Sequence, residues 1–268
     1  MAAGMSHSIT LLGCGSSGGV PRIGGIWGAC DPLNPRNRRR RCSALIEREG
    51  PGGITRVLID TSPDMSVQLI DAGVSAVDAV VYTHGHADHC HGIDDLRQLV
   101  HLSGQRMQVW ADAATSERLM AGFGYVFATP RGSDYPPICD LNLIDGPVTI
   151  PGAGGPVTLT PTAVEHGSIR ALGLRVGGMM YLPDVSEIPE PAMAAFAGLD
   201  LFIIDALRYR PHPSHAHLAR ALGWIERFRP ARSVITNMHI DMDYATLAAD
   251  LPEGVIPAHD GLRLGFAV

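Results

Sequence analysis

The sequence has few cysteines and no apolar run long enough to cross a membrane. An odd number of cysteines without any Cys-x-x-Cys pair argues against a disulfide framework and for a reducing compartment. No stretch of about 18 apolar residues is present, and the first residues lack the charged-then-apolar layout of a secretory signal. We therefore expect a cytoplasmic protein without membrane contact. The five cysteines are Cys14, Cys30, Cys42, Cys90 and Cys139.

Charge is also scarce, and its balance is acidic. Charged residues make up 18% of the chain and the formal net charge is −6, so the molecule as a whole does not attract nucleic acid. The hydrophobic content of 46% fits a globular protein, and 268 residues suffice for a sizeable core. No repeat or low-complexity linker divides the chain. We expect one domain over residues 1–268, with a flexible lead over residues 1–7.

One dense basic run stands out against this background. Arg36 is followed by four consecutive arginines at positions 38–41. Runs of like charge usually lie in solvent, so a solvated loop is the favoured interpretation. The alternative is a local field that attracts an anionic substrate towards a nearby site.

Strand-like and helix-like segments alternate along the chain, which predicts a layered α/β (α+β) structure. Two glycine-rich stretches, at residues 50–53 and 177–178, are hairpin signals. Strands are expected at residues 8–14, 43–48, 55–60, 77–82, 107–110, 157–164, 172–176, 179–182, 199–205 and 233–236. Helices are expected at residues 63–72, 94–102, 113–123, 217–228 and 243–251.

Residues 83–89 read Thr-His-Gly-His-Ala-Asp-His and follow the apolar run 79–82. Three imidazoles and a carboxylate at the end of a buried strand form a suitable binding site for a divalent metal such as Zn, Mn or Fe. A polar loop that happens to be rich in histidine is the plain alternative, and the strand context disfavours it. The candidate metal ligands here are His84, His86, Asp88 and His89.

Three further polar residues follow predicted strands, namely His166, Asp184 and His239. A single histidine in such a place is more often a surface or capping residue. Together with the motif at residues 83–89, however, they supply five histidines and two aspartates, enough for two metals. Two metals about 3.5–4 Å apart can share a bridging hydroxide and a bridging carboxylate. Asp184 is the natural bridge, because its segment holds no other ligand candidate.

These marks, with Leu-Ile-Asp-Thr at residues 58–61, resemble a metallo-β-lactamase-fold hydrolase over nearly the whole chain. The resemblance implies a four-layer αββα sandwich with two metal ions, Zn or Mn foremost and Fe also compatible, at one edge. It implies that one ion is held by His84, His86 and His166. The second ion would then be held by Asp88, His89 and His239, with Asp184 between the two.

Within this family the chain is similar to the phosphodiesterase branch, which opens small cyclic phosphates in bacterial phosphonate breakdown. The marks are the glycine-rich residues 12–19, the arginines before Cys42-Ser43, and Asp-Gly-Leu at residues 260–262. The resemblance implies a dinuclear hydrolase that attacks a cyclic phosphate or nucleotide-like ester through a metal-bridging hydroxide. It also implies a small phosphorylated substrate, no membrane or nucleic-acid partner, and compatibility with a homodimer.

The chain departs from that branch in two places. Gly25 and Trp27 stand where the relatives carry cysteines of a structural zinc cluster, so no structural zinc is expected although Cys30 remains. Asn237 stands where the relatives usually have the last histidine ligand. Residues two apart on a strand face the same side, so His239 is expected to take over that ligand position, with Asn237 as the alternative.

Other residues are expected around the metals. The resemblance places a histidine at position 215, and His215 is expected to act as general acid or as hydrogen-bond donor to a phosphate oxygen, with Asp88 as the second catalytic residue. Asp60 and Asp260 are expected to accept N–H bonds from ligand imidazoles, although Asp60 has the alternative role of a helix cap. Glycines at residues 13–19 let backbone N–H groups approach a phosphate, unless this segment is only a tight turn. The substrate-binding candidates there are Ser16, Ser17 and Gly18.

The favoured function is therefore a metal-dependent phosphodiesterase. A hydrolase of thioesters, lactones or β-lactams on the same metals is the enzymatic alternative, and a nucleotide-binding protein without turnover is the non-enzymatic one. Nucleic-acid processing has only the arginine run in its favour.

Overall fold

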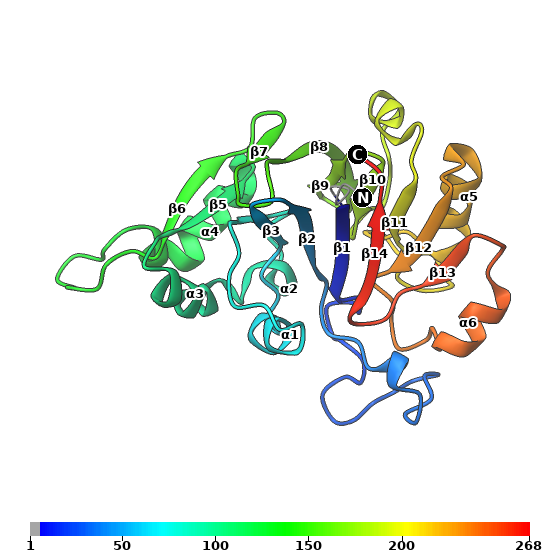
Figure 1. Cartoon of the computed structure of the whole chain (residues 1–268). Coiled ribbons are helices and arrows are strands. Elements are labelled where there is room, and N and C mark those ends of the chain that lie inside the picture. The colour runs from blue at the N-terminus through cyan, green and yellow to red at the C-terminus, as the bar shows by residue number, and fades with distance from the viewer. Residues whose placement is uncertain (1–5) are drawn as a thin grey trace.

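Two β-sheets stack face to face, with helices on the outer face of each, in the computed structural model, which describes residues 6–268 (Figure 1). This arrangement confirms the expected αββα sandwich. The first two described residues already belong to a strand and not to a flexible lead: Ser6 pairs with Glu49, and His7 pairs with Arg48 on one side and Phe266 on the other. Residues 1–5, the remainder of that expected lead, lie outside the described residues.

The two sheets share one plan, in which antiparallel hairpins continue into parallel strands. The first sheet has the order β14-β1-β2-β3-β4-β5-β6 and the second the order β13-β12-β11-β10-β9-β8-β7. The first comprises β1 (Ser6–Gly13), β2 (Ser43–Gly50), β3 (Gly53–Ile59), β4 (Ala79–Val81), β5 (Met107–Ala111), β6 (Cys139–Leu143) and β14 (Leu262–Phe266). The second comprises β7 (Val148–Ile150), β8 (Val157–His166), β9 (Ile169–Val176), β10 (Met179–Leu182), β11 (Leu201–Asp205), β12 (Arg232–Thr236) and β13 (Val255–Pro257).

Helices connect the parallel strands and cover the sheets. Those on the outer face of the first sheet are α1 (Met65–Asp71), α2 (Ala87–Cys90), α3 (Leu96–Ser103) and α4 (Ala113–Phe127), and those on the second are α5 (Leu218–Phe228) and α6 (Tyr244–Asp250). Three short 3-10 helices are η1 (Pro35–Asn37), η2 (Ile93–Asp95) and η3 (Glu190–Phe196). Among the described residues no helix is long and apolar enough to span a bilayer.

Side chains alternate between the two faces of each strand, so the first sheet contributes to two separate hydrophobic cores. In β2, Ala44 and Ile46 face the second sheet, whereas Leu45 faces the helices. The outward core includes Leu69 of α1 and Leu99 of α3, both buried. Full burial of one such side chain stabilises the fold by about 1.5–3 kcal/mol, so the alternation fixes which face of the sheet meets which layer.

The expected hairpins at residues 50–53 and 177–178 are confirmed as β2–β3 and β9–β10. Four strands were not expected: β6, β7, β13 and β14. All are three to five residues long and lie at or next to the sheet edges. A half-exposed edge strand needs no continuous apolar run, so its sequence pattern is weak.

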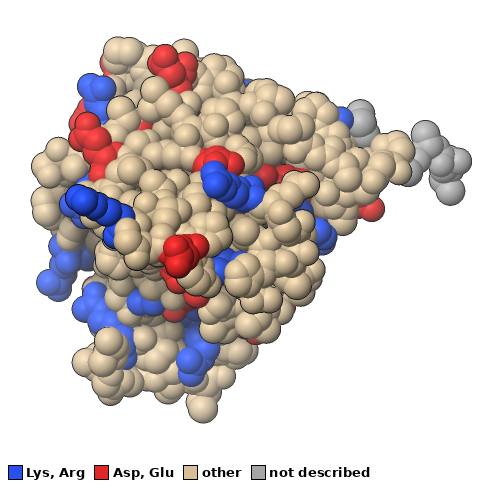
Figure 2. Space-filling model, turned by 90° about the vertical axis from the view of Figure 1, so that its left-hand side faces the viewer, with Lys and Arg blue, Asp and Glu red and all other residues tan. Residues whose placement is uncertain are grey.

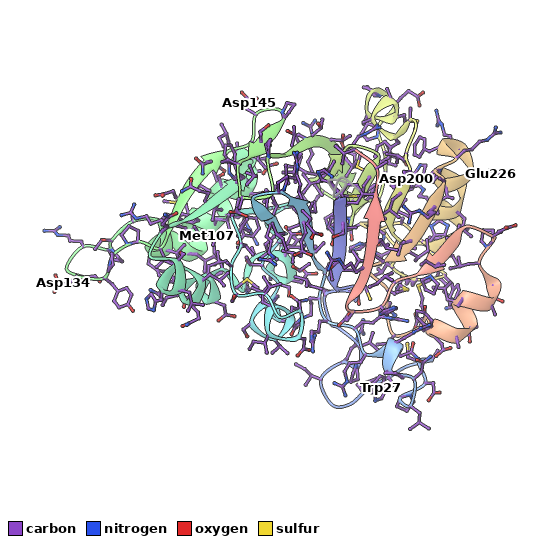
Figure 3. The ribbon with its side chains drawn as sticks, viewed as in Figure 1. Trp27, Met107, Asp134, Asp145, Asp200 and Glu226 are labelled. Atoms are coloured by element: carbon purple, nitrogen blue, oxygen red, sulfur yellow. The ribbon has the colours of Figure 1, made fainter. Side chains whose placement is uncertain are left out.

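The basic run is only partly the solvated loop that its composition suggested. Arg39 is 1% exposed and donates to the carbonyl oxygens of Met242, at 2.7 Å, and His239, at 3.4 Å. Its guanidinium also donates to Oδ1 of Asn37 at 3.1 Å. Arg41 forms a two-pronged ion pair with Asp64. The arginines therefore attach the loop over residues 30–41 to distant parts of the chain. This loop, and Trp27 before it, lie below the two sheets in Figure 3.

Candidate metal centre

The predicted ligands gather where strands of both sheets end. His84 follows β4 in the first sheet, His166 is the last residue of β8, and Asp184 follows β10 in the second. The short helix α2 carries His89. Each is buried, with 1–2% exposure. The carboxyl ends of neighbouring strands meet at one edge of a sheet, so segments far apart in the sequence converge there.

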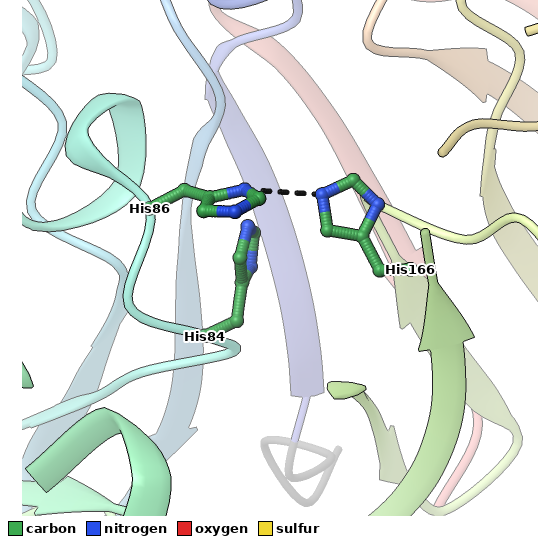
Figure 4. Close-up of side chains that lie close together, drawn as sticks. All are labelled: His84, His86 and His166. Atoms are coloured by element: carbon green, nitrogen blue, oxygen red, sulfur yellow. Dashed lines mark hydrogen bonds between the residues drawn. The ribbon is translucent and has the colours of Figure 1, made fainter. Parts of the chain in front are cut away.

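The side chains form three overlapping groups of potential ligand atoms. Nδ1 of His86 and Nε2 of His166 lie 3.1 Å apart across the gap between the two sheets, with His84 beside them (Figure 4). Within each group the ligand atoms lie within 4.8 Å of one another. The groups are His84, His86 and His166; His84, His89 and Asp184; and His166, Asp184 and His215.

Several atoms of this cluster are buried without a hydrogen bond. Among the described residues, Nε2 of His84, Nε2 of His89 and Oδ2 of Asp184 have no hydrogen-bond partner. Yet Nε2 of His89 and Oδ2 of Asp184 are only 3.0 Å apart. A buried polar atom without a partner costs about 1–3 kcal/mol. Donor atoms that converge without bonding to one another fit divalent cations, for which imidazole and carboxylate are the ordinary ligands.

The far nitrogens of these rings are held by the protein. Oδ2 of Asp60 accepts a hydrogen bond from Nδ1 of His89 at 2.7 Å, and its Oδ1 accepts from the backbone N–H of Thr83 at 2.8 Å. Nδ1 of His166 donates to the carbonyl oxygen of Ser214 at 2.6 Å. These bonds orient Nε2 of His89 and of His166 towards the cluster. The expected role of Asp60 as a partner of a ligand imidazole is thus present in the structure.

The electrostatics of the pocket suit a cation. Burial lowers the pKa of His84, His86 and His166, which keeps these imidazoles neutral and their lone pairs available. His89 differs: burial alone would lower its pKa, but Asp184 and Asp60 outweigh it and hold that pKa well above the usual range. The pocket therefore favours a positive charge at the His89 ring.

Asp88 lies at the rim of the cluster and His239 lies outside it. Oδ2 of Asp88 is 3.6 Å from Nε2 of His89, with the side chain 19% exposed. The structure does not bring His239 to the other ligands: its Nδ1 lies 3.0 Å from Oδ2 of Asp241. The expectation for His239 relied on strand alternation, but β12 ends at Thr236 and the next residue has a φ of 61°. The left-handed turn there breaks the period of two.

Asn237 and His215 both lie next to Oδ1 of Asp184. Nδ2 of Asn237 donates to the carbonyl oxygen of Pro183 at 3.0 Å and lies 3.3 Å from Oδ1 of Asp184. Nδ1 of His215 is 3.3 Å from that same Oδ1 and 3.0 Å from Oδ2 of Asp205. Although burial opposes it, Asp205 raises the pKa of His215 to about 9, so the ring carries a proton at neutral pH. A protonated imidazole at the rim can donate that proton.

Asp205 is a residue of the site that was not predicted from the sequence. Its signal was a carboxylate at the end of the apolar strand β11, but no partner could be assigned before the position of His215 was known. Burial raises the pKa of Asp205 to about 6, although His215 opposes this. The pair is therefore ionised at neutral pH and holds the His215 ring in place.

The predicted substrate-binding residues form a turn beside the centre. Ser16 is 3% exposed, whereas Ser17 and Gly18 are exposed. The expected role of Asp260 is wrong: it accepts hydrogen bonds from the backbone N–H groups of Cys14, at 3.2 Å, and Arg40, at 2.8 Å. Asp260 thus supports the loops beneath the turn and touches no ligand imidazole.

A hollow of about 600 Å³ lies elsewhere, on the outer face of the first sheet next to α1. Several charged residues of its lining are paired, for example Arg56 with Glu47 at 2.8 Å and Arg40 with Asp71. None of the clustered imidazoles borders it. The clustered histidines and aspartates at the strand ends are therefore separate from this hollow.

The sandwich and its histidine–aspartate centre define a metal-dependent hydrolase of the metallo-β-lactamase type. Residues 55–240 match the beta-lactamase superfamily domain, and the chain belongs to this family. Its structure is similar to that of a new diphosphatase from the PhnP family, with a TM-score of 0.86, 35% identity and 98% of both chains covered. The protein YhfI from Bacillus subtilis shares the fold, with a TM-score of 0.70, 16% identity, and 97% of this chain and 99% of that one covered.

A curated relative is the octanoyltransferase of Porphyromonas gingivalis, 32% identical over 256 residues. The match covers 94% of this chain but only 50% of that protein. The chain therefore spans about half the length of this relative.

Proposed function

We propose that this chain is a phosphodiesterase that uses two divalent metal ions and acts on a small cyclic phosphate or nucleotide-like phosphate ester. The observation that carries the proposal is the set of three overlapping ligand groups, two of which share Asp184, while the third shares His84 with one of them and His166 with the other. One group alone would hold one ion, whereas overlapping groups with a shared carboxylate suit a pair. The similarity to a PhnP-family diphosphatase over 98% of the chain supports a phosphate ester as the substrate class.

The residues divide between the two ions as follows. His84, His86 and His166 would hold one ion, His89 with Asp88 the other, and Asp184 would contact both. Zn or Mn suits this donor set best, and Fe is compatible. When bound, such ions supply a water that is acidic enough to attack at neutral pH, and they neutralise charge on the phosphoryl oxygens.

His215 provides the proton for the leaving group, which the ions do not supply. Departure of an alkoxide needs a proton, and His215 carries one at the rim of the centre, oriented by Asp205 at 3.0 Å. Its position beside Asp184, at 3.3 Å, supports a place next to the phosphoryl group of a substrate. We assign it the role of general acid, a role that contributes typically about 10²–10⁴-fold to turnover.

The test is turnover by metal-loaded protein of bis-p-nitrophenyl phosphate and of a panel of cyclic phosphates. His86→Ala removes a rim ligand and should abolish turnover. His101→Ala, on the exposed side of α3, is the matched control and should retain it. Absence of turnover with all of these esters, or wild-type turnover by His86→Ala, would refute the proposal.

Thioester hydrolysis is the second candidate, and the relationship to a protein named octanoyltransferase favours it. The same metal centre polarises a carbonyl as readily as a phosphoryl group. Octanoyl-CoA assayed beside bis-p-nitrophenyl phosphate separates the two functions, because the phosphodiesterase proposal predicts a preference for the phosphate ester of at least tenfold in kcat/KM.

For partners, we propose a small phosphorylated molecule and not nucleic acid. The sequence has no lysine, so every basic side chain in Figure 2 is an arginine. On the face shown, acidic residues lie mainly in the upper part and the centre, and the arginines towards the lower left are separated by uncharged residues and form no continuous basic surface. Such a surface is the usual electrostatic footprint of nucleic-acid binding. A homodimer is compatible with the family, and light scattering of the purified protein tests it.

A further inference from the structure

We propose that His212 is a positioning residue that holds one loop in the conformation required by both a metal ligand and the general acid. This inference rests on the proposed phosphodiesterase function and deepens it, because it names the group that keeps two parts of the centre in place relative to each other. The loop lies between β11 and α5, over residues 208–217, and the backbone N–H of Leu218 closes it by donating to the carbonyl oxygen of Arg208 at 3.0 Å. His212 belongs to none of the three ligand groups, so its contacts inside the loop define its role.

The peptide that joins Ser214 to His215 serves two functional residues at once. Its carbonyl oxygen accepts the 2.6 Å hydrogen bond from Nδ1 of His166, which leaves Nε2 of that ring facing the centre. Its other end carries His215, whose ring lies edge to face against that of His166 with centroids 4.6 Å apart. A displacement of this peptide would therefore disturb the metal ligand and the general acid together.

His212 fixes Ser214 through its ring. The backbone N–H of Ser214 donates to Nδ1 of His212 at 3.3 Å, and Oγ of Ser214 lies 3.2 Å from the same nitrogen. Nδ1 is the acceptor in this geometry, which assigns the ring proton to Nε2. Burial chiefly, and His215 in addition, lower the pKa of His212, so the ring is neutral and its lone pair is available. The contact closes a turn from a side chain to the N–H two residues on, as asparagine and aspartate do in many turns.

The backbone around His212 leaves few other ways to hold Ser214. Prolines precede and follow His212, and a proline fixes its own φ near about −65° and confines the residue before it to extended backbone. Nη2 of Arg208 donates to the carbonyl oxygen of Pro211 at 2.8 Å and holds the start of this segment. Pro213 has no N–H, so the N–H of Ser214 is the first backbone donor after His212. The described part of the chain gives that N–H no acceptor other than the His212 ring.

Ser214 is also packed closely against the residue that follows His166. A Cβ added to Gly167 would meet Cβ of Ser214 at 2.8 Å, closer than Cβ atoms pack, and the φ of Gly167 is 61°. Glycine is therefore required here for both the conformation and the space. The N–H of Gly167 donates to Oγ of Ser186 at 3.0 Å, which holds this side of the contact in place. The contacts with Gly167 and His212 together determine where the carbonyl oxygen of Ser214 lies.

His212→Asn and His212→Gln test the proposal as a matched pair of amides. The side-chain oxygen of asparagine can accept from the N–H two residues on, whereas glutamine carries its amide one carbon further from the backbone and does not form this turn. We expect His212→Gln to lower the affinity for Zn²⁺ severalfold, measured by competition with a chromogenic chelator, because Ser214 no longer holds His166 in place. This loss is smaller than the about 10–100-fold typical of a direct partner of a ligand imidazole, since His212 acts one contact further away. His212→Asn should keep an affinity close to that of the wild type.

Turnover by the metal-saturated proteins gives a second readout. A nucleoside cyclic phosphate has an alkoxide leaving group that needs a proton, whereas the leaving group of bis-p-nitrophenyl phosphate needs none. His212→Gln should therefore lose at least about tenfold in kcat with the cyclic phosphate, a part of the contribution of general acid catalysis, and distinctly less with the p-nitrophenyl ester. His212→Asn should restore turnover of both esters. A variant that is merely less stable would instead have a lower midpoint of urea unfolding and equal losses with the two esters.

His101→Gln, on the exposed side of α3, is the control and should match the wild type in each measurement. Wild-type metal affinity or wild-type turnover of the cyclic phosphate in His212→Gln, or losses in His212→Asn as large as those in His212→Gln, would overturn the proposal. If the wild type hydrolyses no ester, the proposed function fails and the metal affinities alone decide the role of His212. If it hydrolyses esters but neither readout responds to His212→Gln, the function stands and the positioning role fails.

Discussion

Nε2 of His89 and Oδ2 of Asp184 lie 3.0 Å apart without forming a hydrogen bond, while the opposite nitrogen of His89 is bound to Asp60 at 2.7 Å. The ring is thus fixed from behind by one carboxylate and faces another across the centre. Asp60 itself has a φ of 60° and also accepts hydrogen bonds from Thr83. This buried chain of contacts connects the end of β3 to the metal centre.

Asp60→Asn tests whether that contact sets the tautomer of His89. Asparagine tolerates the left-handed backbone, so the change replaces an acceptor by an amide without new strain. The amide would turn Nδ1 of His89 into an acceptor and place the ring proton on Nε2, where a metal must bind. We expect the affinity for Zn²⁺ or Mn²⁺ to fall by about 10–100-fold, measured by competition with a chromogenic chelator. Asp145→Asn, an exposed acid in the loop before β7, is the control, and equal affinities of the two variants would refute the role of Asp60.

Arg39→Met tests the buried guanidinium that fastens the arginine run. The change leaves the carbonyl oxygens of Met242 and His239 and Oδ1 of Asn37 without their donor. We expect the free energy of unfolding to fall by about 2–4 kcal/mol in urea titrations. Arg39→Lys keeps the charge but not the planar fork, so it should lose part of this amount. Unfolding midpoints equal to that of the wild type in both variants would show that these contacts contribute nothing.

The raised pKa of Asp260 predicts that the stability of the folded protein depends on pH. Burial raises its pKa in the folded protein to about 6, against about 4 in the unfolded chain. Below pH 4 the carboxyl is neutral in both states and contributes nothing. Between pH 4 and 6 the unfolded state loses its proton first, so stability decreases as the pH rises, and above pH 6 the loss is constant.

Two pKa units correspond to at most about 3 kcal/mol, less because solvent reaches this partly exposed side chain. Asp260→Asn cannot titrate, so the difference in unfolding free energy between the wild type and this variant should change between pH 4 and 6 and stay level above. A difference that is constant over the whole range would show that the carboxyl has the same pKa in both states.

The sequence predicted well those features that depend on neighbouring residues along the chain. The motif at residues 83–89 and the ends of β8 and β10 carry their ligands within a few residues of a buried strand, so strand signals alone indicated a common pocket for them. The four-layer sandwich came from resemblance, and the short edge strands had no apolar run to show them. Interactions between distant segments were not visible. The burial of Arg39 depends on carbonyl groups some 200 residues away, and solvation was therefore the natural expectation for that run.

The position of His239 shows a second kind of limit. The period-two rule is correct within a strand, but it fails where the strand ends, and strand ends are the least certain part of a sequence-based assignment. Asn237 itself carried the relevant signal, because asparagine is among the few residues that adopt positive φ readily. Read as a turn residue, it would have placed His239 away from the ligands.

His215→Gln separates the role of general acid from that of metal ligand, since Nδ1 of His215 lies close enough to Asp184 for either. An acid matters most for a poor leaving group. The variant should therefore lose about 10²–10⁴-fold in kcat with a nucleoside cyclic phosphate, whose leaving group is an alkoxide, and less than about tenfold with bis-p-nitrophenyl phosphate, whose leaving group needs no proton. Metal content, measured by elemental analysis, should match the wild type. Equal losses with both esters, accompanied by the loss of one ion, would instead make His215 a ligand, and the proton would then have to come from another group at the rim.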